Sequence, residues 1–296
     1  MTVPLDTFQS EVLKVLCRRR TPSSPEAGGA VLQRHGYRAS EDLDIFNAPN
    51  IDVITAAELD MADLKAAGFE LSSSTRYEGF VEAIASKPGF GTTKIQWVQY
   101  SGYNFYEPVP DPEFGWRLHF ADLAVNKVLA AASRRQPRDL VDLYLVHAFV
   151  MPLWHAMWAT PGKDAEMTPE KAIERIRYHS QYARGELQNS VFAADATAIP
   201  SMISDVRNAL DEAEKVFDRL PPDTVGKVLV DATGRPVHSL DEIKMVGQRA
   251  IAAAPGGAWP SGPDIDHFVI ARMIDSYGRN GEKLWTAEPT QPTSNP

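Results

Sequence analysis

The segment from residue 28 to residue 46 constrains the fold more than any other part of the chain. A glycine pair, Gly28-Gly29, is followed after twelve residues by Asp42-Leu43-Asp44-Ile45. On a β-strand alternate side chains share a face, so both aspartates would project together while the apolar residues enter the core. Two adjacent carboxylates repel, and a divalent cation such as Mg²⁺ or Mn²⁺ between them removes that repulsion. Glycines let backbone N–H groups approach a phosphate closely. The segment therefore predicts a site for a metal–triphosphate.

The same residues also fit an exposed edge strand with two solvated aspartates after an ordinary turn. A second Asp-x-Asp, Asp264-Ile265-Asp266, follows Gly256-Gly257 after only six residues. Its aspartates open a predicted helix, where acidic residues complement the helix dipole. We therefore discard the second match. For the first, a metal site and a solvated strand both remain open.

The longer string Arg38-Ala39-Ser40-Glu41-Asp42-Leu43-Asp44-Ile45-Phe46, after its glycine pair, resembles the signature of the nucleotidyltransferase superfamily that includes DNA polymerase β. More narrowly, it is similar to the AbiEii/AbiGii toxin family, whose members have a glycine pair and then Arg-x-Ser-x-Asp-Leu-Asp. Residues 119–127 and 138–143 are similar to that family's Asp-Leu-Ala-x-x-Lys and Arg/Lys-Asp-x-x-Asp-Leu motifs. The resemblance covers residues 26–165 and extends more loosely to residue 238.

The resemblance implies a metal-dependent nucleotidyltransferase that moves an NMP from an NTP to an acceptor hydroxyl and releases pyrophosphate. A metal and a lysine would stabilise the charge that develops on the phosphate oxygens. It also implies the toxin of a type IV toxin–antitoxin or abortive-infection pair, with tRNA as acceptor and a cognate antitoxin as partner. The residues implied are Asp42 and Asp44 as metal ligands, Gly28, Gly29, Arg38, Ser40 and Lys127 as NTP contacts, and Asp139, with Asp142 close by, near the reacting hydroxyl.

Each polar residue outside the Asp-x-Asp pair also has a structural interpretation, and the sequence leaves both open. Polar side chains can line a solvated helix face, and an acidic residue in a first turn complements the helix dipole. The alternatives are a solvated stripe of Asn126, Lys127 and Arg134, a dipole role for Asp139, an i,i+4 ion pair between Asp142 and Arg138, and surface charge at Arg38.

One position departs from the superfamily pattern. Polymerase-type members commonly carry a third carboxylate on a later strand, and the corresponding strand here, residues 94–98, has Gln96 at that position. An amide cannot accept a proton, and general-base help is typically worth about 10²–10⁴ in rate. Asp139 is the predicted substitute. The alternative is a slow or catalytically impaired protein that binds nucleotide without transferring it.

Hydrophobic periodicity predicts an α+β fold in two domains. The first, residues 1–107, is a nucleotidyltransferase-fold domain with a small mixed sheet and flanking helices. The second, residues 108–287, is mainly α-helical with a small β-hairpin near residues 225–238, and residues 288–296 form a disordered tail. Prolines 108, 110 and 112 predict a linker. Predicted helices are 6–20, 56–67, 122–133, 137–150, 168–188, 201–218 and 264–277, and predicted strands are 43–54, 69–73, 79–86 and 92–100.

Charge and cysteine content narrow the class of protein. The 39 acidic and 30 basic residues give a net charge of −9, which steers poorly toward RNA and favours a small-molecule acceptor, as in antibiotic nucleotidyltransferases, as an alternative to tRNA. A single cysteine, Cys17, excludes an internal disulfide framework and fits a reducing compartment. The start of the chain lacks the charge order of an export signal. The uncharged stretch 143–159 reads as a buried helix broken near Pro152 rather than a membrane span. A cytoplasmic location without membrane contact is expected.

Overall fold

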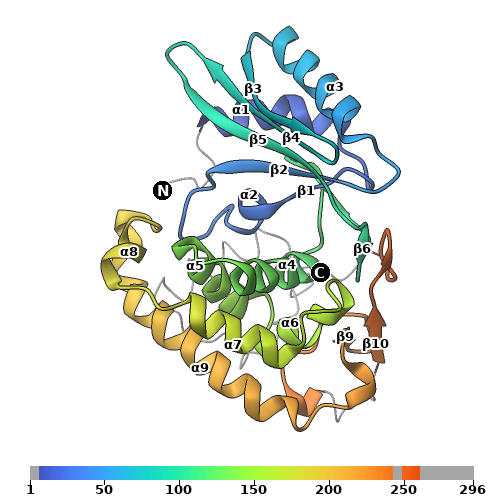
Figure 1. The fold of residues 1–296 in the computed structure, drawn as a ribbon, viewed down its shortest axis with the longest axis vertical. Coiled ribbons are helices and arrows are strands. Elements are labelled where there is room, and N and C mark those ends of the chain that lie inside the picture. Colours follow the sequence, from blue (N-terminus) through green and yellow to red (C-terminus); the bar gives the residue numbers. More distant parts are fainter. Residues whose placement is uncertain (1–6, 243–248, 261–296) are drawn as a thin grey trace, which may run out of the picture.

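The computed structural model describes residues 7–242 and 249–260, and Figure 1 shows a sheet above a group of helices. The α+β class is confirmed: a mixed sheet with flanking helices precedes a mainly helical part. The predicted helix 264–277 and the predicted tail 288–296 lie outside the described residues. The strands are β1 (Glu26–Ala27), β2 (Asp42–Asn47), β3 (Glu70–Tyr77), β4 (Phe80–Lys87), β5 (Gly91–Gln99), β6 (Tyr103–Asn104), β7 (Val109–Asp111), β8 (Gly115–Arg117), β9 (Lys227–Val230), β10 (Arg249–Ala252) and β11 (Ala254–Pro255).

The main sheet has the strand order β3-β4-β5-β2-β1-β8-β7. β2 runs parallel to β5 and antiparallel to β1. Leu43, Ile45, Ile95 and Trp97 alternate with polar residues along β2 and β5 and are fully buried. Helices α1 (Thr7–Leu16) and α3 (Val53–Ala66) pack on this apolar face. The period-2 pattern thus fixes which face of the sheet is core and leaves the polar residues on the other face.

The remaining helices lie below the sheet in Figure 1, with α2 between the sheet and the others. They are α2 (Gly28–Leu32), α4 (Phe120–Ser133), α5 (Pro137–Leu145), α6 (Leu153–Trp158), α7 (Pro169–His179), α8 (Arg184–Gln188) and α9 (Ile199–Phe217). α4 packs against α5, α6 and α7, and α9 covers α5, α6 and α7. The proposed start signals at α7 are confirmed, because the Thr168 side chain accepts the Lys171 N–H and Pro169 opens the helix.

Several predicted elements have different bounds. The predicted linker instead forms β7 and β8, which extend the main sheet to Arg117, beyond the expected boundary at residue 107. β7 is the edge strand, where Pro110, which has no N–H to donate, is tolerated. The predicted strand 43–54 ends at Asn47, ahead of Pro49. The predicted helix 168–188 is split between α7 and α8, and the main-chain oxygen of Gln181 in the break accepts a hydrogen bond from Arg135.

The predicted hairpin near residues 225–238 is present as a short pairing across the turn at 231–234. Val230 and Pro236 form an antiparallel bridge, the Val237 N–H donates to the Leu229 carbonyl, and the Asp231 N–H donates to the Arg235 carbonyl. The longer antiparallel ladder of β9 is formed with β10, a strand that the sequence does not predict.

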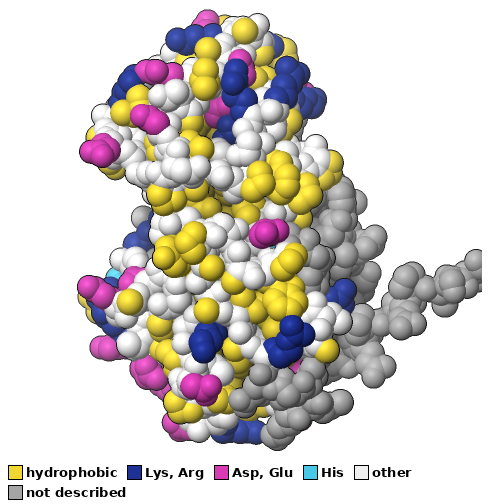
Figure 2. All heavy atoms as spheres, turned by 90° about the vertical axis from the view of Figure 1, so that its right-hand side faces the viewer, with side chains coloured by type: hydrophobic (Ala, Val, Ile, Leu, Met, Phe, Trp, Pro, Cys, Tyr) yellow, Lys and Arg dark blue, Asp and Glu magenta, His cyan; other side chains and the backbone are white. Residues whose placement is uncertain are grey.

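The apolar stretch 143–159 is buried in the helical part. Within residues 7–242 and 249–260, no single helix has the length and apolar character needed to cross a membrane. The segments Pro137–Val150 and Leu153–Gly162 are bent by 108° relative to each other, consistent with the predicted break at Pro152. In Figure 2 the upper and lower lobes meet at a narrower waist where hydrophobic side chains gather.

Candidate active site

Asp42 and Asp44 lie on the same face of β2, opposite the apolar face that packs on α1 and α3. In the parallel pairing with β5, Asp42 faces Lys94 and Asp44 faces Gln96. Asp42 is 8% exposed, and Asp44 is partly exposed. The predicted alternation is therefore confirmed. Because β2 is a central strand with β1 and β5 on either side, the alternative of an exposed edge strand is wrong.

The glycine pair lies directly against the second aspartate. Gly28 has a positive φ of +72°, and a Cβ placed there would be 1.8 Å from Asp44 Oδ2. A Cβ on Gly29 would be 2.9 Å from an Arg38 guanidinium nitrogen and 3.0 Å from Ser40 Oγ. Both glycines are thus required by close approach. The structure brings together five of the predicted site residues around this turn.

The electrostatics of Asp44 fit a cation site. Burial and the neighbouring carboxylate of Asp42 raise the pKa of Asp44 to about 6, although the charges of Lys127, Arg138 and Lys94 act to lower it. A carboxylate whose negative charge is disfavoured gains from a bound cation, because the cation removes the repulsion that raises the pKa. The pair is therefore suited to a positive ligand.

Asp142 holds two cations in place. Its carboxylate accepts from Arg38 Nε and Nη2, both at 2.8 Å, and from Gln33 Nε2 at 2.8 Å, and it lies 2.8 Å from Lys127 Nζ. Burial alone would raise the pKa of Asp142, but the charges of Arg38 and Lys127 hold it well below its ordinary value. Asp142 is fully buried. Asp142 therefore fixes the orientation of the Arg38 and Lys127 side chains.

These contacts exclude the structural interpretations given above for Lys127 and Asp142. Lys127 is buried, so it does not belong to a solvated stripe. Arg138 donates to Glu41 at 2.7 Å rather than pairing with Asp142. Asp139 accepts from Arg134 Nε at 2.9 Å and from Arg134 Nη2 at 3.0 Å, so both its oxygens are engaged.

Arg38 and Ser40 make internal contacts in this arrangement. Arg38 is 4% exposed and, besides Asp142, donates from Nη1 to the carbonyl of Ala39. Ser40 Oγ donates to the carbonyl of Asp42 at 2.8 Å. These bonds fix the backbone at the start of β2 and the side chains that pack against Gly29. Arg38 and Ser40 therefore shape the site through their internal contacts.

Lys94 adjoins Asp42, and Glu82 adjoins Lys94 and Gln96; the sequence prediction assigns a site role to neither Lys94 nor Glu82. Lys94 Nζ lies 3.6 Å from Asp42 Oδ2 and 3.7 Å from Glu82 Oε2. Gln96 Nε2 donates to Glu82 Oε2 at 2.6 Å. Glu82 comes from β4, which precedes the expected third-carboxylate strand, and no spacing rule connects it to the Asp-x-Asp motif. Only the strand pairing identifies it.

The donor set fits Mg²⁺ held largely by its substrate. Among the described residues, no three His, Cys, Asp or Glu side chains are grouped so that they could hold a metal ion together. Mg²⁺ is nevertheless commonly bound by one or two protein carboxylates, with phosphate oxygens and water completing its octahedral shell. Asp42 and Asp44 would be the ligands here.

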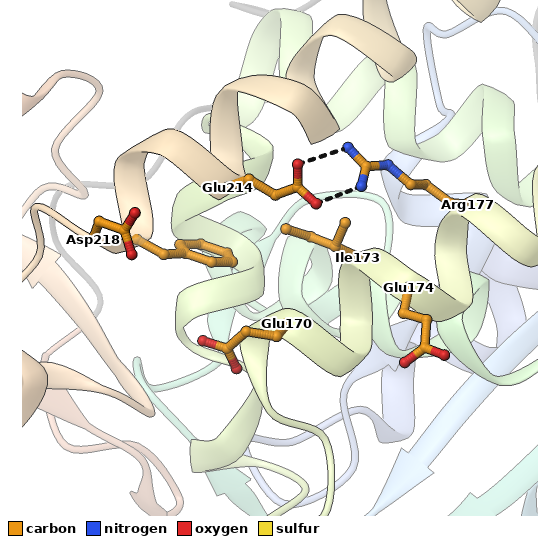
Figure 3. Close-up of a pocket in the computed structure, with 7 residues that line it drawn as sticks. Glu170, Ile173, Glu174, Arg177, Glu214 and Asp218 are labelled. Carbon is orange, nitrogen blue, oxygen red and sulfur yellow. Dashed lines mark hydrogen bonds and ion pairs between the residues drawn. The ribbon is translucent and has the colours of Figure 1, made fainter.

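A groove between α7 and α9 is another feature that could receive a ligand (Figure 3). It holds about 430 Å³ and is floored by Ile173 and Phe217. Its charged lining is acidic apart from Arg177, which is paired with Glu214 and Asp211. Such a lining repels a polyphosphate, so a nucleotide is better accommodated at the aspartates of β2. The acidic residues of the groove are Glu170, Glu174, Glu214 and Asp218.

Among comparisons with known proteins, only the search of solved structures gives matches. No protein-family model and no curated protein matches the chain. A candidate nucleotidyltransferase from H. pylori matches with 14% identity and a TM-score of 0.43, over 72% of this chain and 97% of that one. MenT4, a nucleotidyltransferase toxin from Mycobacterium tuberculosis, matches with 13% identity and a TM-score of 0.36, over 70% and 91%. Cid1 poly(U) polymerase bound to MgATP matches with 17% identity and a TM-score of 0.26, over 52% and 41%.

Proposed function

We propose that this chain is a metal-dependent nucleotidyltransferase that transfers an NMP from an NTP to an acceptor hydroxyl. The observation that carries the proposal is the contact between Asp44 and Gly28, with Asp42 on the same face of β2. It combines a pair of carboxylates suited to a cation with a glycine turn suited to a phosphate.

The chain's own residues account for binding and charge stabilisation. Asp42 and Asp44 would hold Mg²⁺, which when bound supplies Lewis-acid stabilisation of charge on the phosphate oxygens. Lys127, held by Asp142, exerts its positive charge on Asp44 and would stabilise the departing pyrophosphate. Gly28 and Gly29 keep the phosphate side free of Cβ atoms.

Labelling with α-³²P NTPs tests this mechanism. Wild-type protein with Mg²⁺ should transfer label to an RNA, protein or metabolite fraction, and Asp42→Ala and Asp44→Ala should each abolish labelling. Glu70→Gln, an exposed acidic position on β3, serves as a control and should label normally. Unchanged labelling by either aspartate variant would exclude the mechanism.

We further propose that the protein is a toxin, with tRNA as the acceptor and a protein antitoxin as partner. This more specific proposal rests on the resemblance to the AbiEii/AbiGii family. Incubating labelled NTP with total tRNA and, separately, with aminoglycoside-type metabolites distinguishes RNA from a small-molecule acceptor. Growth arrest on expression that requires Asp44 would support the toxin role. Growth equal to that of the Asp44→Ala strain would contradict it.

A second candidate function is nucleotide binding without transfer, favoured by Gln96, which stands in register with Asp44 and cannot accept a proton. Calorimetry with Mg²⁺ and each NTP, alongside a pyrophosphate-release assay, separates the two functions. Tight binding without pyrophosphate release in the presence of all three acceptor fractions would favour the second.

A further inference from the structure

We infer that Glu82 is the base that receives the proton of the acceptor hydroxyl, and that Gln96 positions it. The inference rests on the proposed function and assigns a role that neither the sequence motifs nor their family pattern gives to this residue.

Three side chains form a row across the open face of the sheet. Asp44 on β2 is in register with Gln96 on β5, and Gln96 is in register with Glu82 on β4. Neighbouring strands lie about 4.8 Å apart, so the backbones of Asp44 and Glu82 are separated by about 10 Å. That separation leaves room for a phosphorus centre and an attacking oxygen between the two carboxylates.

The sheet order distinguishes two sides of Asp44. Gly28 and Gly29 follow β1 on one side of β2, and Glu82 lies beyond β5 on the other. In phosphoryl and nucleotidyl transfer the attacking oxygen and the leaving group are roughly in line on opposite sides of the phosphorus. With the pyrophosphate on the glycine side, the acceptor approaches over β5 and β4.

The β4 side is also the open side. The Glu82 side chain is 20% exposed against 11% for Asp42, and Ile84, on the same face of β4, is 40% exposed. An acceptor can therefore reach Glu82 from solvent without moving the core. Asp139, the substitute predicted from the sequence, is 3% exposed and uses both oxygens to bind Arg134.

Glu82 is fixed in orientation by its neighbours. Gln96 Nε2 donates to Glu82 Oε2, and Lys94 Nζ lies between Glu82 and Asp42. An amide at position 96 thus has a positive function, because it donates a hydrogen bond that a carboxylate at that position could not. The carboxylate lies one strand away from the expected position, and the amide at that position donates to it.

The acceptor O–H proton passes to the Glu82 carboxylate as the acceptor oxygen forms a bond to the α-phosphorus. The bond from the α-phosphorus to the bridging oxygen breaks, and its electron pair leaves with pyrophosphate beside Lys127. Transfer of the proton to solvent restores Glu82.

The test compares Glu82→Gln with Asp44→Asn and with the control Glu70→Gln. Mn²⁺ binding by electron paramagnetic resonance and NTP binding by calorimetry should change less than about twofold in Glu82→Gln. Single-turnover transfer of α-³²P label to the fraction that wild type labels should fall by about 10²–10⁴. Asp44→Asn should lose Mn²⁺ binding, and Glu70→Gln should match wild type throughout.

A rescue variant makes the test specific. Glu82→Gln combined with Gln96→Glu returns a carboxylate to the same row, one strand nearer to Asp44, and should recover at least tenfold of the lost rate. Glu82→Asp, which keeps the charge, covers the case in which Glu82→Gln does not fold, and should transfer more slowly than wild type with unchanged Mn²⁺ affinity.

Three results would overturn the inference. They are wild-type transfer by Glu82→Gln, loss of Mn²⁺ binding in Glu82→Gln to the extent seen in Asp44→Asn, and absence of rescue in the folded double variant. If wild type itself binds NTP but labels no fraction, the proposed function fails first, which separates that failure from the failure of Glu82 alone.

Discussion

Two separate constraints require glycine at position 28: its backbone conformation, and its close contact with Asp44. Its φ of +72° costs an L-residue roughly 1–2 kcal/mol, and a Cβ would displace the Asp44 carboxylate. Gly28→Ala should therefore destabilise the fold and lower the affinity for Mg²⁺ and NTP more than tenfold. Chemical unfolding and calorimetry measure the two effects separately.

Gly68 provides the matched control for that variant. Its φ is +86°, and nothing lies within 4 Å of the position that a Cβ would occupy. Gly68→Ala should show the backbone strain, about 1–2 kcal/mol, with unchanged NTP affinity. Equal NTP affinities for the two alanine variants would show that the contact with Asp44 does not matter for binding.

Glu26 should make stability depend on pH. It is fully buried on β1, its two carboxyl oxygens have no hydrogen-bond partner, and burial raises its pKa to about 8. Between about pH 4.5 and pH 8 the folded chain keeps a proton that the unfolded chain releases, so stability falls as pH rises through this window.

The neutral variant Glu26→Gln removes that linkage. We expect its free energy of unfolding, relative to wild type, to increase by on the order of 3 kcal/mol from pH 5 to pH 8. Urea unfolding at several pH values measures the difference. A constant difference across this range would mean that Glu26 is ionised in the folded protein.

At the scale of elements, α5 presents two aspartates whose surroundings differ. Asp142 neutralises Arg38 and Lys127, both nearly fully buried, whereas Asp139 pairs with Arg134, whose side chain is 46% exposed. Removing one partner of a buried pair costs about 3–5 kcal/mol, because the remaining charges stay buried. An exposed arginine regains water instead.

We therefore expect Asp142→Asn to destabilise the protein by about 3–5 kcal/mol and Asp139→Asn by about 1 kcal/mol. Thermal and urea unfolding of the two variants side by side measures the difference. A larger loss in Asp139→Asn would contradict the burial argument, and a catalytic effect of Asp139→Asn without destabilisation would support its predicted role near the acceptor.

Alternation and caps were sufficient to predict much of the fold from the sequence. The polar and apolar faces of β2 and β5 follow from period-2 patterning, and α7 begins at its Thr-Pro signal because both effects are local. β7 and β8 were missed because prolines suggest a linker, and pairing with a distant strand is not visible locally. The partner of β9 was missed for the same reason.

The candidate site likewise contains residues that local sequence spacing predicts and residues that only tertiary pairing brings in. Gly28, Asp42 and Asp44 lie within one short segment, so their spacing predicts their proximity. Glu82 is brought to Gln96 only by antiparallel pairing of β4 with β5, and Arg38 meets Asp142 across 104 residues. The internal partners of Arg38 and Ser40 are likewise tertiary contacts that a motif does not contain.

At the scale of the whole molecule, the net charge of −9 is distributed unevenly. Lys127, Lys94 and Arg138 act on Asp44, while the groove between α7 and α9 gathers acidic side chains. A polyanionic nucleotide should therefore bind at β2 and avoid the groove. The site on β2 contains Lys127 and the groove contains Arg177. Removing each cation in turn tests which of the two sites binds the nucleotide.

Ligand-linked stability provides that test in the intact chain. A ligand at one hundred times its Kd stabilises the folded state by about 2.7 kcal/mol, and this raises Tm by several degrees. Wild type and Arg177→Met should both show the rise with Mg²⁺ and NTP, and EDTA should abolish it. Lys127→Met should show little or none, because it removes the positive charge that acts most strongly on Asp44 while Asp142 keeps Arg38 as its partner. A rise that is lost in Arg177→Met and kept in Lys127→Met would move the nucleotide to the groove and contradict the site on β2.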